Sequence, residues 1–280
     1  MKIIIHGGFF SESSTNSETK IAKQNALSQI VRNSYEYLKT HSALETVVFA
    51  VSQLEDDPLF NAGIGSQIQS DGKIRMSASI MDGEFQKFSG VINIENVKNP
   101  VQVAQILLQE DDRVLGGSGA TNYARSKGFS EFSTEIPQRK AEYDAKLLSL
   151  GTGTVGCVAI DNAGKIAVAT STGGKGFELA GRISDSATVA GNYANQFCGV
   201  SLTGVGEDIV SNATAAKIVT RVTDGMTLKE AFDKTFAELL PYDGFAGAIA
   251  IDYLGNMYHQ NSHPTMVFAR YDGNILKVFE

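Results

Sequence analysis

The residues best suited to chemistry lie in the middle of the chain, in the run G-T-G-T-V-G at residues 151–156. As G-x-G-x-x-G, this run is the fingerprint of a dinucleotide-binding loop. As glycine followed by threonine, it is a place where the chain could cut itself and expose a threonine amine beside the threonine hydroxyl. Such a terminal threonine carries its own general base. The run therefore permits two chemistries, a cofactor loop or a self-made nucleophile at Thr154.

The elements on either side of this run distinguish the two chemistries. A dinucleotide fingerprint lies between a strand and a helix, because the pyrophosphate binds at the N-terminus of the helix. Here the order is reversed, since residues 141–148 predict a helix before the glycines and V-G-C-V-A-I at 155–160 predicts a strand after them. The sequence therefore disfavours a dinucleotide site and directs attention to Thr154.

Three segments after Thr154 combine hydroxyl, charged and glycine residues: S-T-G-G at 171–174, G-R-I-S-D-S at 181–186 and L-T-G-V-G-E at 202–207. Each segment alone has an ordinary structural explanation. Threonine is common in strands, an exposed Arg–Asp pair contributes little stability, and T-G-V-G can form a turn. The order and spacing of the three segments together favour a functional site.

Other catalytic patterns are incomplete. The chain has four histidines and two cysteines, and neither set has the spacing of a metal site. No serine lies in a complete G-x-S-x-G elbow, and no G-x-x-x-x-G-K-[ST] phosphate loop is present. We therefore expect neither a metal nor a cofactor in catalysis.

The composition is that of an ordinary globular protein, with 280 residues, 42% hydrophobic and 20% charged. The net charge of -7, without a run of lysine or arginine, argues against nucleic acid and anionic membranes as partners. No apolar run is long enough for a signal peptide or a membrane span. Cys157 and Cys198 are too few for a disulfide framework. We expect two buried free thiols and a cytoplasmic protein.

Strands and helices are predicted in groups, which indicates an α+β fold rather than a βαβ alternation. Capping boxes at Ser42 and Thr227 and a first-turn proline at Pro100 mark helix starts. Residues 130–150 are polar and predict an exposed linker with a short helix. Helices are predicted at 18–40, 42–54, from 100, at 141–148, 207–222 and 228–239, and strands at 3–5, 73–81, 91–94, 155–160, 166–170 and 247–252.

Taken in order, these segments resemble those of the plant-type L-asparaginases, also called isoaspartyl peptidases, which are N-terminal-nucleophile hydrolases. The resemblance extends to H-G-G at 6–8, L-E-D-D-P-L-F-N-A-G-I-G at 54–65 and M-D-G at 81–83. It implies a four-layer αββα sandwich formed by residues 1–280 as a single domain.

The resemblance also implies that the chain cuts itself between Gly153 and Thr154, into residues 1–153 and 154–280. The Thr154 hydroxyl would attack the Gly153 carbonyl, where glycine gives little hindrance. The freed α-amine, with a pKa of roughly 7.7–8.0, could then accept the hydroxyl proton near neutral pH. Thr152 offers a second hydroxyl, and we favour Thr154 because V-G follows it directly.

The other roles implied by the resemblance concern the substrate and the transition state. Arg182, a planar fork, would hold the substrate α-carboxylate, and Asp185 would take its α-ammonium group. The Thr203 hydroxyl and the Gly204 amide would form the oxyanion hole. Thr172 would form a hydrogen bond with Thr154 and orient it.

Two further sets of residues carry implied roles. Asn61 and Gly206 would help to bind the substrate. A structural sodium ion would be held by backbone carbonyls of one loop, those of Leu54, Glu55, Asp57, Phe60, Ala62 and Ile64.

The implied activity is hydrolysis of the side-chain amide of L-asparagine or of the β-peptide bond of isoaspartyl dipeptides, by a homodimer of cleaved protomers. Two alternatives stay open: a glycosylasparaginase-like amidase, and a non-catalytic relative that keeps the fold for binding or assembly. The chain also departs from the family pattern. Phe9 and Phe10 follow H-G-G where relatives carry A-G, and N-S-H-P-T stands at 261–265 where relatives carry N-T-E-G.

Overall fold

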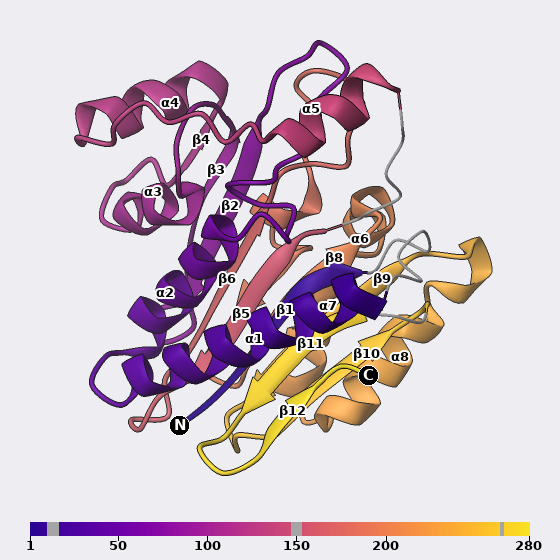
Figure 1. The fold of residues 1–280 in the computed structure, drawn as a ribbon. Helices are drawn as coiled ribbons and strands as arrows, with labels where there is room; N and C mark the ends of the chain where they lie inside the picture. Colours follow the sequence, from indigo (N-terminus) through magenta and orange to yellow (C-terminus); the bar gives the residue numbers. More distant parts are fainter. Residues whose placement is uncertain (10–16, 147–152, 264–265) are drawn as a thin grey trace.

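The computed structural model describes residues 1–9, 17–146, 153–263 and 266–280, and the strands in these ranges form two sheets (Figure 1). The strands are β1 (Lys2–Phe9), β2 (Met76–Asp82), β3 (Lys87–Ile94), β4 (Val114–Gly116), β5 (Val155–Ile160), β6 (Ile166–Thr172), β7 (Asn192–Ala194), β8 (Cys198–Gly204), β9 (Ala246–Asp252), β10 (Met257–Asn261), β11 (Met266–Tyr271) and β12 (Leu276–Val278). The larger sheet has the spatial order β12-β11-β1-β5-β6-β2-β3-β4, and the smaller sheet has the order β10-β9-β8-β7. Neighbouring strands are antiparallel except for β3 and β4.

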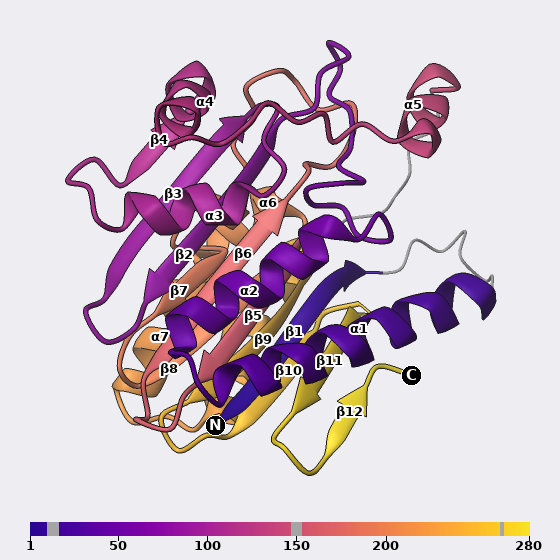
Figure 2. The ribbon, with the colours of Figure 1, turned by 60° about the vertical axis from the view of Figure 1, so that its left-hand side comes forward.

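Helices cover both sheets. They are α1 (Ser17–Leu38), α2 (Ala43–Asp56), α3 (Pro100–Leu107), α4 (Gly117–Ser126), α5 (Pro137–Asp144), α6 (Gly206–Asn212), α7 (Thr214–Thr223) and α8 (Leu228–Ala237), with 3-10 turns η1 (Asp185–Ala187) and η2 (Leu240–Tyr242). Helices α1 and α2 pack on β1, β5, β6 and β11, as Figure 2 shows, and α7 and α8 pack on the smaller sheet. Strands of the two sheets also contact each other, including β6 with β8 and β1 with β9.

The predicted helix starts are confirmed where a local signal marked them. Ser42 Oγ accepts a hydrogen bond from the Glu45 amide at 3.2 Å, and the Glu45 carboxylate accepts one from the Ser42 amide at 2.9 Å. Thr227 and Glu230 form the same reciprocal box at the start of α8. Each cap stabilises its helix by roughly 0.5–2 kcal/mol. Pro100 is in the first turn of α3, as predicted.

The central strands place Thr154 at one end of the larger sheet. Strand β5 begins at Val155 and lies between β1 and β6, with Gly156 opposite His6 and Val155 opposite Ser171. Every residue of β5 is buried, as its apolar sequence predicts for a strand that is covered on both faces. Because β5 and β6 are antiparallel, the start of β5 and the end of β6 meet at the same edge.

The helix predicted over 207–222 is wrong as a single element. Ala213 has a left-handed backbone with φ of 49°, and it separates α6 from α7. Helix α6 contacts η1 and β8, whereas α7 packs on β7, β8 and α8. The helix predicted at 141–148 lies earlier, because Pro137 begins α5. Residues 147–152, with Thr152, are outside the described ranges, as are Phe10, Pro264 and Thr265.

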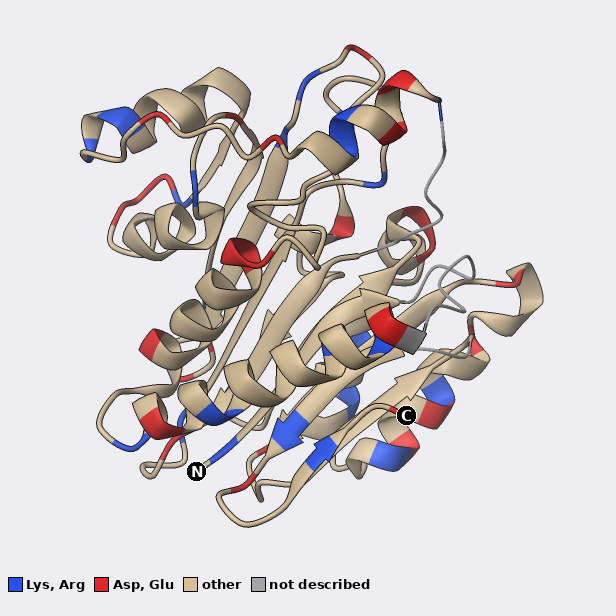
Figure 3. Ribbon diagram, in the orientation of Figure 1, with Lys and Arg blue, Asp and Glu red and all other residues tan. Residues whose placement is uncertain are grey.

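Cys157 and Cys198 are buried free thiols, as expected. In the described part of the chain, every helix is too short or too polar to span a membrane. Figure 3 shows acidic and basic residues interspersed over helices and loops, in keeping with the absence of a lysine or arginine run from the sequence.

Candidate active site

A cavity of about 120 Å³ opens where β5 begins and where β6 and β8 end. Its lining residues lie between Gly153 and Glu207 in the chain. The antiparallel pairing of β5 with β6 and the packing of β8 on both strands bring them together. The predicted site residues that line it are Gly153, Thr154, Thr172, Arg182, Asp185, Gly204 and Gly206.

Thr154 is buried beside this cavity, 7% exposed, in the residue position just before β5. Its hydroxyl lies 3.4 Å from the hydroxyl of Ser186, which is fully buried in η1. A side chain at position 153 would place its Cβ 2.6 Å from Asn61 Cβ, so close packing requires glycine before Thr154. The carbonyl that Thr154 would attack is therefore carried by a residue without a side chain.

Thr172 and Asn61 support the cavity by contacts with one turn. The Thr172 hydroxyl accepts a hydrogen bond from the Gly174 amide at 3.2 Å, and the Asn61 side-chain amide donates to the Gly174 carbonyl at 2.5 Å. The hydroxyl contact of Thr154 in the described residues is with Ser186 rather than with Thr172. Thr172 lines the same cavity, so both hydroxyl groups lie near Thr154 in the uncut chain.

Glu207 binds one edge of the Arg182 guanidinium group, the edge formed by Nε and Nη2. Arg182 Nε and Nη2 donate to the two carboxylate oxygens of Glu207 at 2.8 Å and 3.0 Å. These hydrogen bonds lower the pKa of Glu207 to about 2, so the pair stays ionised at neutral pH. A guanidinium group has five N–H donors, so Arg182 can hold Glu207 and the carboxylate of a ligand together.

Asp185 faces the same cavity and is 3% exposed. Its Oδ2 atom has no hydrogen-bond partner among the described residues. Burial raises the pKa of Asp185 to about 7, and the nearby Arg182 charge opposes this shift. A cationic group in the cavity would satisfy the carboxylate and lower its pKa. Gly206 permits this arrangement, because a Cβ there would lie 2.7 Å from Arg182 Nη2 and 2.8 Å from Asp185 Oδ1.

Asp185→Asn should stabilise the protein, and the gain should grow with pH. The folded pKa is about 7, above the ordinary value of 3.8, so between these values the folded state holds more protons than the unfolded state. Wild-type stability therefore falls as pH rises through this window, and asparagine removes the loss. Thermal unfolding of both proteins at about pH 5 and about pH 8 measures the effect. Equal gains at both pH values would contradict the raised pKa.

Gly204, the last residue of β8, lines the cavity, whereas Thr203, the residue before it, is not among the lining residues. Thr203 is fully buried, and its hydroxyl has no hydrogen-bond partner among the residues that the structure describes. A buried donor without a partner costs about 1–3 kcal/mol, which a negative oxygen in the cavity would offset. Gly204 has φ of 144°, and a Cβ there would lie 2.3 Å from the Phe245 carbonyl oxygen, so other residues are excluded.

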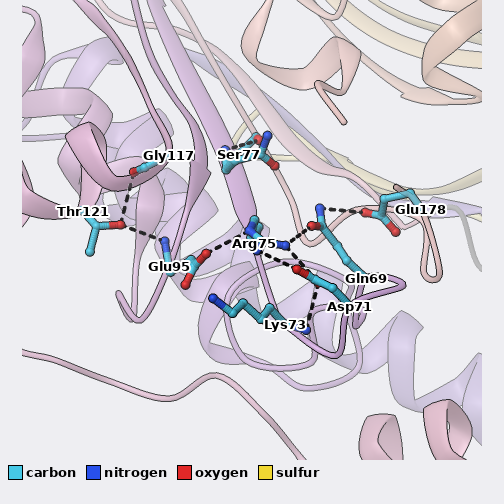
Figure 4. Close-up of polar contacts among 10 residues, drawn as sticks. Gln69, Asp71, Lys73, Arg75, Ser77, Glu95, Gly117, Thr121 and Glu178 are labelled. Atoms are coloured by element: carbon cyan, nitrogen blue, oxygen red, sulfur yellow. Dashed lines mark hydrogen bonds and ion pairs between the residues drawn. The ribbon is translucent and has the colours of Figure 1, made fainter. Parts of the chain in front are cut away.

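A polar network that includes Glu178, Gln69, Arg75 and Glu95 contacts the turn beside the cavity, and Figure 4 shows these four side chains. The Lys175 amide donates to Glu178 Oε1 at 3.3 Å, and Gln69 Nε2 lies 3.5 Å from the same oxygen. Arg75 donates to Gln69 Oε1 at 2.5 Å and to Glu95 at 2.8 Å. The network joins the turn at 173–178 to the start of β2.

His6, the first residue of the H-G-G motif, lies between the sheets. Its Nε2 atom is 2.8 Å from Ser201 Oγ, which is 2.7 Å from Thr170 Oγ1. Burial lowers the pKa of His6 to about 3, opposed by the backbone of Thr154, so the ring is neutral. The His6 side chain thus links β1 of the larger sheet to β8 of the smaller sheet.

The sequence did not single out three residues that contact the predicted site: Ser186, Glu207 and Lys175. Ser186 and Glu207 stand within segments that did attract notice, G-R-I-S-D-S and L-T-G-V-G-E. Their residue types gave no separate signal, because serine beside a turn and glutamate in a first helical turn are common. Among the described residues, no group of three His, Cys, Asp or Glu side chains could hold a metal ion.

Comparison with known proteins gives the family. The family model described as "Asparaginase" matches residues 1–145 and 132–279. An "Isoaspartyl peptidase/L-asparaginase" of Synechocystis sp. is 44% identical over 98% of this chain and 89% of its own length. An "Isoaspartyl peptidase" of Escherichia coli is 36% identical over 91% of this chain and 88% of its own. A "Plant-type L-asparaginase" of Pyrococcus furiosus is 34% identical over 95% of each chain. The chain therefore belongs to the asparaginase family.

Proposed function

We propose that this protein is a threonine amidohydrolase that cuts itself and then hydrolyses the β-amide of L-asparagine and the β-peptide bond of isoaspartyl dipeptides. The observation that carries the proposal is one cavity that is lined by Thr154, Arg182, Asp185 and Gly204. The names of the similar proteins support the same two substrate classes.

The first reaction makes the nucleophile. Thr154 Oγ attacks the Gly153 carbonyl carbon, the peptide C–N bond breaks, and the acyl group moves from nitrogen to oxygen. Water then hydrolyses the ester, leaving a carboxylate on Gly153 and a free amine and hydroxyl on Thr154. The crowding of Gly153 against Asn61 supports this step, since it fixes the carbonyl-bearing residue beside the hydroxyl.

The second reaction uses the new amine as its base. The amine takes the hydroxyl proton of Thr154, and the oxygen attacks the amide carbon of the substrate. The oxyanion that forms accepts hydrogen bonds from Thr203 and Gly204. Protonation of the leaving nitrogen releases ammonia or the next amino acid and leaves an aspartyl ester. Water, deprotonated by the same amine, attacks this ester and frees aspartate.

Substrate orientation follows from charge. The aspartyl α-carboxylate pairs with the Arg182 side chain, and the α-ammonium group pairs with Asp185, whose Oδ2 has no other described partner. Glu207 fixes the Arg182 guanidinium through two hydrogen bonds before substrate arrives. Two opposite charges side by side select an α-amino acid end and hold the amide toward Thr154.

Ser186→Ala should slow self-cleavage by about 3- to 10-fold, the cost of one hydrogen bond to the attacking hydroxyl. Ser186→Thr keeps a hydroxyl and should retain most of the rate. The time course of fragment appearance on a denaturing gel measures both variants. Equal rates for the alanine variant and the wild type would show that Ser186 does not position Thr154.

The helix contacts on each sheet and the contacts between sheets support a four-layer αββα sandwich and a single domain over residues 1–280. A homodimer of cleaved protomers is proposed from the family resemblance. A cytoplasmic location is proposed from the two free cysteines.

A structural sodium ion is also proposed, and its loop fits such an ion chemically. Leu54 and Glu55 are in the last turn of α2, where carbonyl groups lack helical partners. Glu55 and Asp57 carbonyls each accept one loop hydrogen bond, from the Ile64 and Phe60 amides, and keep a second lone pair. Carbonyl oxygens suit a hard cation. The ion would stiffen the loop that carries Asn61 and would take no part in the reaction.

Hydrolysis assays test the proposed activity. The incubated protein should release ammonia and aspartate from L-asparagine, and leucine and aspartate from β-aspartyl-leucine. Release of aspartate only from a glycosylated asparagine would favour the glycosylasparaginase alternative. Aspartate binding without turnover of any of the three compounds would favour a non-catalytic relative.

A further inference from the structure

The opening of the cavity is marked by two charged side chains. Lys175 and Glu207 line the cavity and are 49% and 52% exposed, whereas Thr154 and Asp185 are buried. If an aspartyl group occupies the small interior, as the proposed function requires, any residue joined to it through the β-amide must extend toward this opening. Lys175 and Glu207 are then the charges that it meets.

These two charges are not equally available. Both carboxylate oxygens of Glu207 accept hydrogen bonds from Arg182 at 2.8 Å and 3.0 Å. Lys175 Nζ lies 3.4 Å from one of those oxygens, a longer contact than either of the Arg182 bonds. An ammonium group has three N–H donors, so Lys175 can bind a further carboxylate while Glu207 stays with Arg182.

A hydrogen bond from the Lys175 amide holds the backbone of this residue in place, so its side chain extends from a fixed position. Gly174, with φ of 85°, precedes it in a turn, and the Lys175 amide donates to the buried Glu178 carboxylate. Glu178 is in turn joined through Gln69 to Arg75, as Figure 4 shows. A lysine anchored in this way loses less entropy when it forms an ion pair than one on a mobile loop.

We infer that Lys175 is a specificity-determining residue that binds the free α-carboxylate of the residue following the β-aspartyl group. The inference rests on the proposed function and adds to it. Isoaspartyl dipeptides with a free carboxylate gain this contact, whereas asparagine has no such group and a dipeptide amide has lost its charge. The site therefore discriminates among β-aspartyl compounds by whether the residue that follows the β-aspartyl group carries a free, charged α-carboxylate.

The test compares β-aspartyl-leucine with β-aspartyl-leucine amide, which differ only in that carboxylate. The quantity measured is kcat/KM for β-aspartyl-leucine divided by kcat/KM for its amide. The change of this ratio between wild type and variant reports the contact between Lys175 and the carboxylate. Lys175→Gln should lower the ratio about 5-fold, as expected for a half-exposed ion pair. Lys175→Arg should keep most of the ratio, and Lys175→Glu should lower it further. High salt should lower the wild-type ratio in the same direction.

Lys127→Gln is the matched control. Lys127 is 44% exposed and pairs with Glu110 at 2.8 Å, so the substitution removes a similar ion pair away from the cavity. Its ratio should equal that of the wild type. An unchanged ratio in Lys175→Gln, with both compounds hydrolysed by the wild type, would overturn the inference and leave the proposed function standing. A wild-type protein that hydrolyses neither compound nor asparagine would overturn the proposed function itself.

Discussion

Thr154→Ala should leave the chain whole and reduce amidohydrolase activity by at least about four orders of magnitude. The substitution removes the only atom that attacks both the Gly153 carbonyl and the substrate amide in the proposed mechanism. It also prevents formation of the amine that acts as the base. A denaturing gel and an ammonia assay measure the two losses in one preparation.

Two other variants make this result specific. Thr154→Ser keeps a hydroxyl and an amine and should retain both events at a reduced rate. Thr152→Ala changes the neighbouring hydroxyl and should still give a fragment that begins at Thr154. A Thr154→Ala protein that is cut at the same bond would remove Thr154 from the mechanism.

Arg182→Ala should lower kcat/KM for L-asparagine by about 10²-fold or more, mainly through KM. Truncation of one partner in a buried charge pair costs 2–5 kcal/mol or more. Here the loss would also leave Glu207 and the buried Asp185 carboxylate without their cation. Arg182→Lys should recover only part of the loss, because an ammonium group cannot make the two parallel hydrogen bonds of the guanidinium fork.

Arg221→Gln provides a control for the general effect of losing a buried arginine. The Arg221 side chain is 15% exposed and pairs with Glu238, as Arg182, 14% exposed, pairs with Glu207. It lies in α7, away from the cavity. This variant should lower the melting temperature and leave KM unchanged. If both arginine variants changed KM alike, Arg182 would have a structural role only.

The parts of the fold that were predictable depend on short-range signals. The boxes at Ser42 and Thr227 and the proline at Pro100 involve residues within one helical turn, so the sequence reveals them directly. The strand at Val155–Ile160 was predicted with its observed bounds, because an apolar run between glycine-rich turns leaves little choice.

The parts that were not predictable depend on tertiary packing. The left-handed Ala213 separates α6, which contacts η1 and β8, from α7, which packs on β7, β8 and α8, and no glycine or proline marks this break in the sequence. The Arg182–Glu207 pair joins residues 25 positions apart, and the contact of Ser186 with Thr154 spans 32 positions. The burial of Glu55 was also not predictable, because it depends on a contact with Ser171, which is 116 positions away in the chain. Its carboxyl accepts a hydrogen bond from Ser171 at 2.6 Å, and burial raises its pKa to about 8.

Intact-mass spectrometry of the wild-type chain after incubation at neutral pH tests the central claim most directly. The account predicts that the 30.0 kDa chain is replaced by two species, residues 1–153 and 154–280, whose masses add up to that of the chain plus one water. It also predicts that the second fragment begins with Thr154. A chain that stays at its full mass while it hydrolyses asparagine, or a fragment that begins at any other residue, would contradict it.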